Sequence, residues 1–267
     1  MKLPLRESLV EADHFFLYDH DVRELHNPAL SDFTRLMYVT RFQFVLSIVK
    51  QYAPGKRVLD VGCAQGNFSL ALAERGYAVV AIDLRPSFLR YLRFKYEHGH
   101  LHCVTATVEA FPFRASTFDL VLLAEVIEHV AYPERLVRDL VRLLSPGGVL
   151  VVTTPNGDRL HTGLPTLRAV GDRRELVVRQ FRPDADGHLF LLTRAELLTV
   201  IENARLEVTQ HQFFNTPWVT GRLGARRVSR FLPVKARAGL DRLTVGLPVL
   251  GRLLSDGQLV VARKSWS

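Results

Sequence analysis

The feature that most constrains this chain is an alternation of short apolar runs with amphipathic segments between Arg57 and Thr154. The apolar runs have the length and β-branched content of buried strands: RVLDVG, AVVAID, LHCVTA, FDLVLLAEV and VLVVTT. Helical spacing of apolar residues, bounded by Pro or Gly, marks NFSLALAERG, PSFLRYLRFKYEHG and PERLVRDLVRLL. Strands that alternate with helices predict βαβ units, and therefore a mostly parallel α/β sheet with helices on both faces.

The flanking segments complete a single domain in this interpretation. Apolar residues recur at helical spacing from Phe33 to Tyr52 and from Thr193 to Asn203, and the runs LEVTQHQFF and QLVVARK are strand-like. We expect N-terminal cap helices over 1–53, a cofactor-binding core over 54–156, a substrate-side insertion over 157–188, further core over 189–214, a basic and apolar insertion over 215–256, and a final strand over 257–267.

Composition and sequence pattern indicate the cellular location of the protein but do not identify its binding partner. No apolar run approaches the roughly 18–20 residues of a membrane-spanning helix, and the first residues lack the pattern of a signal peptide. The two cysteines form neither a metal-like pair nor a disulfide framework, so we expect a cytoplasmic location. The net charge of +8 suits nucleic acid, a membrane surface or a phosphorylated substrate, but it equally suits an arginine-rich solvated surface.

The carboxyl ends of the first two predicted strands hold the candidate ligand site. In an open parallel sheet, ligands bind beyond these ends. The first strand runs into Asp60 and a loop whose small residues, Gly62, Cys63, Ala64 and Gly66, let backbone approach a ligand. The second strand ends at Asp83, whose carboxylate can accept hydrogen bonds from two ribose hydroxyls.

Two nucleotide cofactors fit this outline, and the loop distinguishes them. A dinucleotide needs G-x-G-x-x-G so that its pyrophosphate can lie on a helix N-terminus, whereas this loop reads Gly62, Ala64 and Asn67 at those positions. Asp60 would also repel a pyrophosphate. An acid at that place suits a cofactor with a cationic amino-acid end, which favours S-adenosylmethionine over NAD.

The successive segments VLDVGCAQG, AIDL, TVEAFPF, FDLVLLAEVIEHV and LLSPGGVLVVTTPN resemble the motifs of class I S-adenosylmethionine-dependent methyltransferases, in order and with helix-sized gaps. The resemblance covers about Arg57 to Asn156. It implies a Rossmann-like, seven-stranded sheet whose last strand, here QLVVARK, runs antiparallel between two others.

The same resemblance assigns candidate cofactor residues. It gives Asp60 and the loop of Gly62, Cys63, Ala64 and Gly66 to the methionine end of the cofactor. Asp83 would bind the ribose and Leu84 would pack on the adenine, with Thr107 and Val108 at the adenine edge. Glu125 is a further cofactor candidate. Thr107 stands where relatives often have Asp, and its hydroxyl is a weaker acceptor for the adenine amino group.

The E-x-x-E-H element after the fourth strand is the candidate for chemistry. If the turn is helical, Glu125, Glu128 and His129 share one face. With His188 they would make a site for Mg²⁺ or another divalent cation, which could lower the pKa of a substrate hydroxyl. His129 could instead act as a general base without metal, or only pack. The element resembles ubiquinone-pathway O-methyltransferases and small-RNA terminal 2′-O-methyltransferases.

We therefore expect a methyltransferase acting on oxygen of a small-molecule or lipid-linked acceptor. The alternatives are an RNA 2′-O-methyltransferase, for which no RNA-binding module is recognisable, and a cofactor-binding regulatory protein without activity. Arginines interleaved with apolar residues in 215–256 suit a peripheral membrane contact, an acidic acceptor or a solvated lid.

Overall fold

The computed structural model describes residues 2–29, 32–180 and 187–266. Within these ranges seven strands form one sheet in the order β3-β2-β1-β4-β5-β7-β6. β1 to β5 pair in parallel, and β7 lies antiparallel between β5 and β6. The predicted Rossmann-like sheet with an antiparallel last strand is confirmed. Part of the expected insertion over 157–188, residues 181–186, lies outside the described residues.

The strands are β1 (Arg57–Val61), β2 (Ala78–Asp83), β3 (His100–Thr105), β4 (Phe118–Ala124), β5 (Leu144–Pro155), β6 (Leu206–Phe214) and β7 (Gly257–Lys264). The helices before β6 are α1 (Ala12–Glu24), α2 (Phe33–Tyr52), α3 (Asn67–Ala73), α4 (Pro86–Lys95), α5 (Pro133–Leu143), α6 (Arg174–Arg179) and α7 (Arg194–Asn203). Those between β6 and β7 are α8 (Pro217–Thr220), α9 (Arg226–Ser229), α10 (Val234–Gly246) and α11 (Pro248–Leu254).

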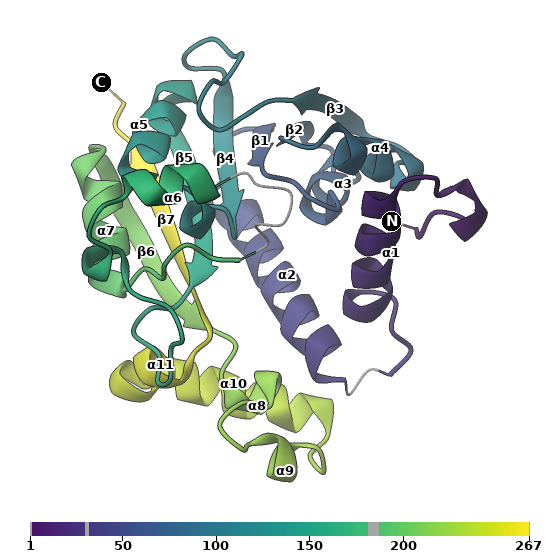
Figure 1. The fold of residues 1–267 in the computed structure, drawn as a ribbon, viewed down its shortest axis with the longest axis vertical. Coiled ribbons are helices and arrows are strands. Elements are labelled where there is room, and N and C mark those ends of the chain that lie inside the picture. The colour runs from purple at the N-terminus through teal and green to yellow at the C-terminus, as the bar shows by residue number, and fades with distance from the viewer. Residues whose placement is uncertain (1, 30–31, 181–186, 267) are drawn as a thin grey trace.

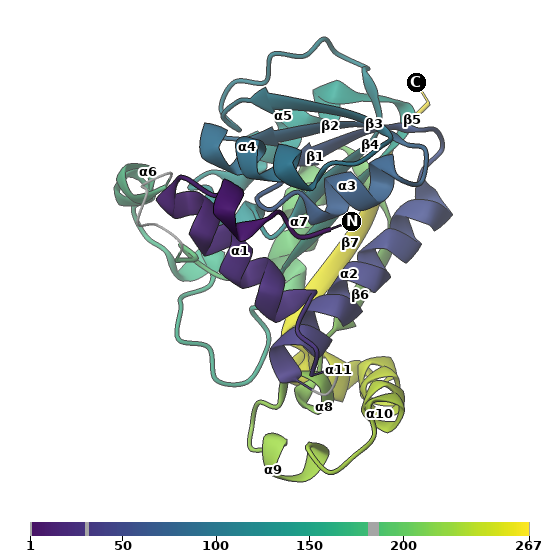
Figure 2. The same ribbon diagram turned by 90° about the vertical axis from the view of Figure 1, so that its right-hand side faces the viewer.

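Helices cover both faces of the sheet (Figures 1 and 2). Successive residues of each central strand enter opposite cores, because side chains alternate across a pleated strand. In β4, Leu120 and Leu122 pack with α2 and α3, whereas Val121 and Leu123 pack with α5 and α7. Burial on both faces explains why these strands read as continuous apolar runs in the sequence.

Two boundaries differ from the sequence prediction. The helix that begins at Pro86 ends at Lys95 rather than at Gly99, and Tyr96 is already extended, with its hydroxyl bonded to the Gly99 carbonyl. β5 begins at Leu144 rather than at Val149, and its pairing with β4 shifts register between Phe118 and Leu120. Residues 145–148, which lie between the predicted helix and the predicted strand, thus form an irregularity inside the strand.

A buried polar network joins the N-terminal helices to the sheet. Lys95 of α4 and Asp21 of α1 form an ion pair of 2.5 Å, and both side chains are fully buried. Asn67, at the start of α3, donates to Asp21 and to the Tyr38 hydroxyl of α2. Lys95 also donates to the Asn67 side chain and, over 3.1 Å, to the carbonyl of Gln65 in the glycine-rich loop. One network therefore fixes four helices against the loop.

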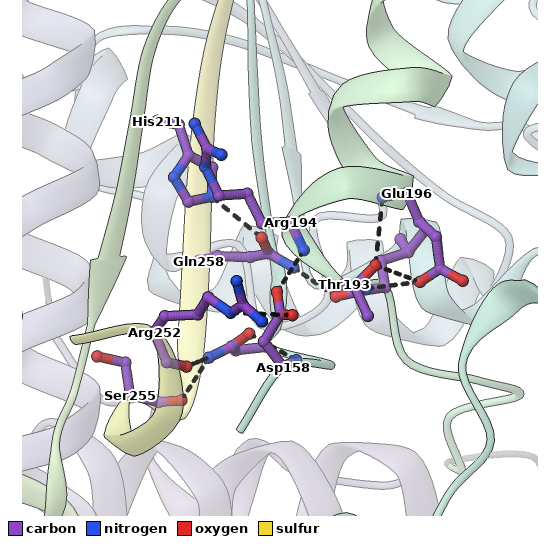
Figure 3. A network of polar contacts seen from close by, with 10 residues as sticks. Asp158, Thr193, Arg194, Glu196, His211, Arg252, Ser255 and Gln258 are labelled. Carbon is purple, nitrogen blue, oxygen red and sulfur yellow. Dashed lines mark hydrogen bonds and ion pairs between the residues drawn. The ribbon is translucent and has the colours of Figure 1, made fainter. Parts of the chain in front are cut away.

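Residues 215–256, which we term the lobe, project from one end of the molecule (Figure 1). The lobe joins the end of β6 to the start of β7, and its root is held by polar contacts (Figure 3). Arg252 pairs with Asp158 over 3.3 Å, and Gln258 bonds to His211 and to the Leu192 carbonyl. Within the described residues no helix, in the lobe or elsewhere, is long and apolar enough to cross a membrane.

The network predicts a large penalty for removing one partner of the buried pair. Lys95→Met should lower the free energy of unfolding by about 3–5 kcal/mol, because it leaves the Asp21 carboxylate buried and unpaired. Urea unfolding measures the change, with the exposed Lys56→Met as the matched control. The double variant Asp21→Asn/Lys95→Met should lose less than the two single changes added together. Equal stability of Lys95→Met and Lys56→Met would contradict this role.

Candidate active site

The loop after β1 turns sharply at the carboxyl edge of the sheet. Gly62 and Gly66 have φ angles of +66° and +74°, which favour glycine. A Cβ at Gly62 would lie 2.7 Å from Val126 Cγ2, and one at Gly66 would overlap Leu92. Ala64 adopts a φ of +45° between them, and its N–H donates to Asp83 over 3.0 Å. The loop is therefore shaped by close packing and is tied to the end of β2.

Asp60 and Asp83, the two predicted acidic residues, lie at this edge of the sheet, and burial disfavours the ionised form of both carboxyl groups. Asp60 is buried and accepts a hydrogen bond from Ser69, and burial raises its pKa to about 6. Burial also raises the pKa of Asp83, although the N–H groups of Arg85 and Ala64 oppose the change. A cationic or hydroxyl-bearing ligand would supply the partners that water no longer provides.

A cavity of about 500 Å³ opens at the strand ends. Its lining includes most of the predicted site residues, which come from the ends of β1, β2 and β4 and from the segments that follow: Gly62, Ala64, Asp83, Leu84, Val108, Glu125, His129 and His188. Candidate cofactor residues and candidate catalytic residues therefore share one chamber. This chamber has the size expected of a small-molecule site.

A smaller cavity of about 160 Å³ adjoins it and shares Gly62, Ala64, Gln65, Arg41 and Glu125. Asp60 and Cys63 line this smaller cavity, on the side of the loop that faces the protein interior. Burial raises the pKa of the Cys63 thiol well above its usual range, which makes it a poor nucleophile.

The two residues at the predicted adenine edge differ in position. Val108 lines the larger cavity, whereas Thr107 is not among its lining residues. The Thr107 hydroxyl instead accepts a hydrogen bond from the N–H of Glu109. Gly66 is also absent from the lining, and its role is to start α3 in the left-handed conformation.

The E-x-x-E-H element does not form an α-helical turn. Glu125 has a φ of +57°, and only Ile127–His129 form a short 3-10 helix. As a result, the Glu125 carboxylate turns to Arg41, over 3.2 Å, and accepts a hydrogen bond from Thr153. The expectation that Glu125, Glu128 and His129 share one helical face is wrong.

Glu128, His129 and His188 do come together, with one ligand atom from each within 4.8 Å of the others. The two imidazole rings meet edge to face, with centroids 5.0 Å apart. Glu128 is fully buried, and burial together with the charge of Glu125 raises its pKa well above the usual range. Burial lowers the pKa of His188, so its ring favours the neutral form that can bind a metal or accept a proton.

The chemistry of this cluster fits a divalent cation. Glu128 Oε2 accepts a hydrogen bond from Thr154, but its Oε1 has no hydrogen-bond partner among the described residues and lies 3.9 Å from His188 Nε2. A buried carboxylate oxygen without a partner carries a large desolvation penalty, which a cation would offset. One carboxylate and two imidazoles form a donor set that transition metals accept.

Helices α1 and α2 contribute lining residues that the sequence did not single out as a set. Phe16, His20 and Glu24 come from α1, and Arg41 comes from α2. Burial raises the pKa of Glu24 while the positive charge of Arg41 lowers it. The sequence predicts a helix from Phe33 to Tyr52, which carries Arg41. The apolar stripe of α1 is weak, so the sequence gives no indication that α1 lines the cavity.

Residues 59–152 match the model of a family described as a methyltransferase domain. Solved structures with the same fold include an S-adenosylmethionine-dependent methyltransferase from Mesorhizobium loti (TM-score 0.58, 20% identity, 86% of this chain and 98% of that one). A second comes from Archaeoglobus fulgidus (TM-score 0.55, 16% identity, 85% of this chain and 96% of that one). The strand order and these solved structures show that the chain has the fold of S-adenosylmethionine-dependent methyltransferases, and residues 59–152 are similar to a methyltransferase domain.

Among curated proteins, the chain is similar to ubiquinone biosynthesis O-methyltransferases. That of Xanthomonas oryzae is 31% identical over 157 residues, which make up 58% of this chain and 64% of the relative. That of Coxiella burnetii is 35% identical over 163 residues, which make up 58% of this chain and 66% of the relative. The matched part thus spans slightly less than two thirds of each relative.

The position of Asp83 predicts its contribution to cofactor binding. Asp83→Asn should weaken binding of S-adenosylmethionine and S-adenosylhomocysteine alike by roughly a hundredfold, because the charge-assisted bonds to the ribose are lost. Calorimetric titration measures both affinities. Asp172→Asn, which removes an exposed carboxylate paired with Arg174, is the control and should bind like the parent. An unchanged affinity in Asp83→Asn would place the ribose elsewhere.

Proposed function

We propose that this chain transfers a methyl group from S-adenosylmethionine to a hydroxyl oxygen of a small-molecule or lipid-linked acceptor. The observation that carries the proposal is the shared chamber, in which Asp83 and the loop after β1 face the same space as His129 and His188. The curated relatives are named as O-methyltransferases, which supports oxygen as the acceptor atom.

The residues divide into a binding part and a reacting part. S-adenosylmethionine supplies a methyl group already activated by its sulfonium centre. Asp83 holds the ribose, and Asp60 and the loop position the cationic methionine end. Leu84 and Val108 supply apolar contacts for the adenine. Holding the methyl donor against the acceptor makes the transfer effectively unimolecular, and this orientation alone can lower the activation barrier by several kcal/mol.

The reacting part must remove the acceptor proton. His129 lines the chamber beside His188, and a neutral imidazole can accept a proton from a hydroxyl that lies against it. Glu128, His129 and His188 would be the residues that hold a divalent cation such as Mn²⁺, and a cation there would lower the pKa of an acceptor hydroxyl. Arg41 and Glu125 form the wall between the two parts.

RNA 2′-O-methylation is the second candidate function. The Glu128–His129–His188 cluster and the excess of basic residues favour it. The two functions separate in one assay, in which radiolabelled methyl transfer is measured onto hydroxylated aromatic acceptors, with and without a lipid tail, and onto short RNA. Transfer to RNA alone would replace the first proposal with the second, and transfer to neither group would contradict both.

The proposed base predicts a loss in rate rather than in binding. His129→Gln should lower kcat by about 10²–10⁴-fold, because proton removal then depends on solvent. Affinity for S-adenosylmethionine should stay within about threefold of the parent, since the ribose contacts are untouched. Steady-state kinetics and calorimetry give the two values. The exposed His98→Gln is the control. Unchanged kcat in His129→Gln would remove the residue from the mechanism.

The cluster also predicts a metal-dependent change in stability. Saturating Mn²⁺ should raise the Tm of the parent by about 5 °C, because the cation binds only the folded site. Glu128→Gln should abolish this increase and, without metal, should melt no lower than the parent, since the amide replaces a buried carboxyl group whose ionised form burial disfavours. Thermal melts with Mn²⁺ and with a chelator measure both effects.

Glu125→Gln is the matched control for the metal, because its carboxylate lies against Arg41 and outside the cluster. It should keep the increase caused by Mn²⁺. A parent protein with the same Tm in Mn²⁺ and chelator would contradict a metal site. Loss of the increase in Glu125→Gln would restore the four-ligand set expected from the sequence.

A further inference from the structure

The lobe carries most of the excess charge of the chain. Residues 215–256 contain eight basic and two acidic residues, a formal charge of +6 out of +8 for the whole chain. All of the basic side chains except Arg237 are exposed. Both acidic residues are engaged, because Asp241 accepts hydrogen bonds from Thr216, and Asp256 pairs with Arg159 and Arg222. The exposed surface of the lobe is therefore strongly positive.

Large apolar side chains are exposed among these charges. The most exposed are Phe231 (75%), Leu243 (71%), Val249 (67%) and Val228 (61%). Arg230 lies over the Phe231 ring, 4.6 Å from its centroid. A solvated helix that only covers the core would bury its apolar residues and expose polar ones. Apolar groups beside arginines are typical of surfaces that enter the headgroup region of a bilayer.

The lobe lies at the edge of the sheet where the parallel strands end and where the proposed acceptor would bind. We term this the acceptor edge. Gly257, where the chain returns from the lobe, pairs with Pro155 at the carboxyl end of β5, the same edge at which the chamber opens. Helix α2 connects the two regions directly. Phe33, in its first turn, lies beneath Arg237 and Arg226 of the lobe, with ring-to-guanidinium distances of 4.2 and 5.3 Å. Arg41, about 12 Å further along the helix, lines the chamber.

We propose that the lobe binds the surface of an anionic lipid bilayer and thereby turns the acceptor edge of the sheet toward the membrane. The positive surface matches anionic headgroups, and the aliphatic side chains gain by leaving water in the interfacial region. RNA fits less well, because non-specific single-strand binding uses several aromatic platforms, whereas Phe231 is the one aromatic residue among the exposed large apolar residues described in the lobe. A second copy of the lobe would bring like charges together.

Several polar contacts fix the lobe rigidly to the sheet at its root, where Arg252 and Ser255 meet Asn156 and Asp158. The Asn156 side chain donates to the carbonyls of Arg252 and Ser255, and Arg252 pairs with Asp158. The backbone N–H of Arg194 also donates to Asp158, which links the root to α7 (Figure 3). A surface that holds the lobe therefore holds the sheet at a defined angle. Binding of the lobe stands apart from the proposed function, whereas delivery of a lipid-linked acceptor rests on it.

Vesicle sedimentation without S-adenosylmethionine tests the binding itself. The probes are vesicles of 30% phosphatidylglycerol in phosphatidylcholine, vesicles of phosphatidylcholine alone, and a 20-nucleotide RNA at equal phosphate. The full chain should bind the anionic vesicles most tightly, and binding should weaken as salt rises. The triple variant Arg227→Gln/Arg230→Gln/Phe231→Ser should bind them at least about tenfold more weakly.

The matched control removes two exposed arginines and one exposed apolar residue away from the lobe, as Arg6→Gln/Arg138→Gln/Val10→Ser. It should bind like the parent, and both variants should keep the thermal melt of the parent. Equal binding to neutral and anionic vesicles, equal loss in both variants, or tighter binding to RNA would overturn the proposal. Affinity for S-adenosylmethionine, measured in the same variants, reports on the proposed function separately.

Discussion

The buried pair of Asp21 and Lys95 is the interaction on which the arrangement of the candidate active site depends. Both side chains are excluded from water, and such a pair is stable only when its remaining donors and acceptors are satisfied. Tyr91, Asn67 and the Gln65 carbonyl satisfy them here. Because these partners belong to α3, α4 and the loop after β1, the N-terminal helix cannot leave the chamber without exposing or orphaning a charge. The covering of the site is thus coupled to the shape of the cofactor loop.

The chamber that this network closes is rich in carboxylates whose ionised form is disfavoured. Burial raises the pKa values of Glu24, Asp60, Asp83 and Glu128, while Arg41 and Arg85 are the cations among the described lining residues of the two cavities. A positively charged ligand would stabilise the ionised form of these carboxylates. S-adenosylmethionine carries a sulfonium and an ammonium group, and a divalent cation would serve the orphaned oxygen of Glu128. Ligand charge and site charge are therefore complementary, which dinucleotide phosphates would not be.

The fold and the sharp turn after β1 were predictable from the sequence because their signals are local. Strand length, β-branched content and Gly62 or Gly66 in a turn each follow from steric rules that act within a few residues. The main failure came from contacts between distant segments, because the predicted helical turn from Glu125 to His129 did not include the ion pair of Glu125 with Arg41 or its hydrogen bond from Thr153. Thr107 differs for a local reason, since its hydroxyl accepts a hydrogen bond from the N–H of its neighbour Glu109. Helix α1 was expected only as one of the cap helices, since its lining residues Phe16, His20 and Glu24 gain meaning only from tertiary packing.

The positive charge of the chain is concentrated in one region, which the composition alone could not show. A net charge of +8 spread evenly would describe an arginine-rich surface with no particular partner, but +6 of it lies in the 42 residues of the lobe. The chamber has the opposite character, since carboxylates outnumber cations among its described lining residues. The proposed cationic ligand and the proposed anionic surface would therefore meet regions of opposite charge and would not compete. Because α2 touches both regions, a chain held at the lobe presents the chamber at a fixed height above whatever surface holds it.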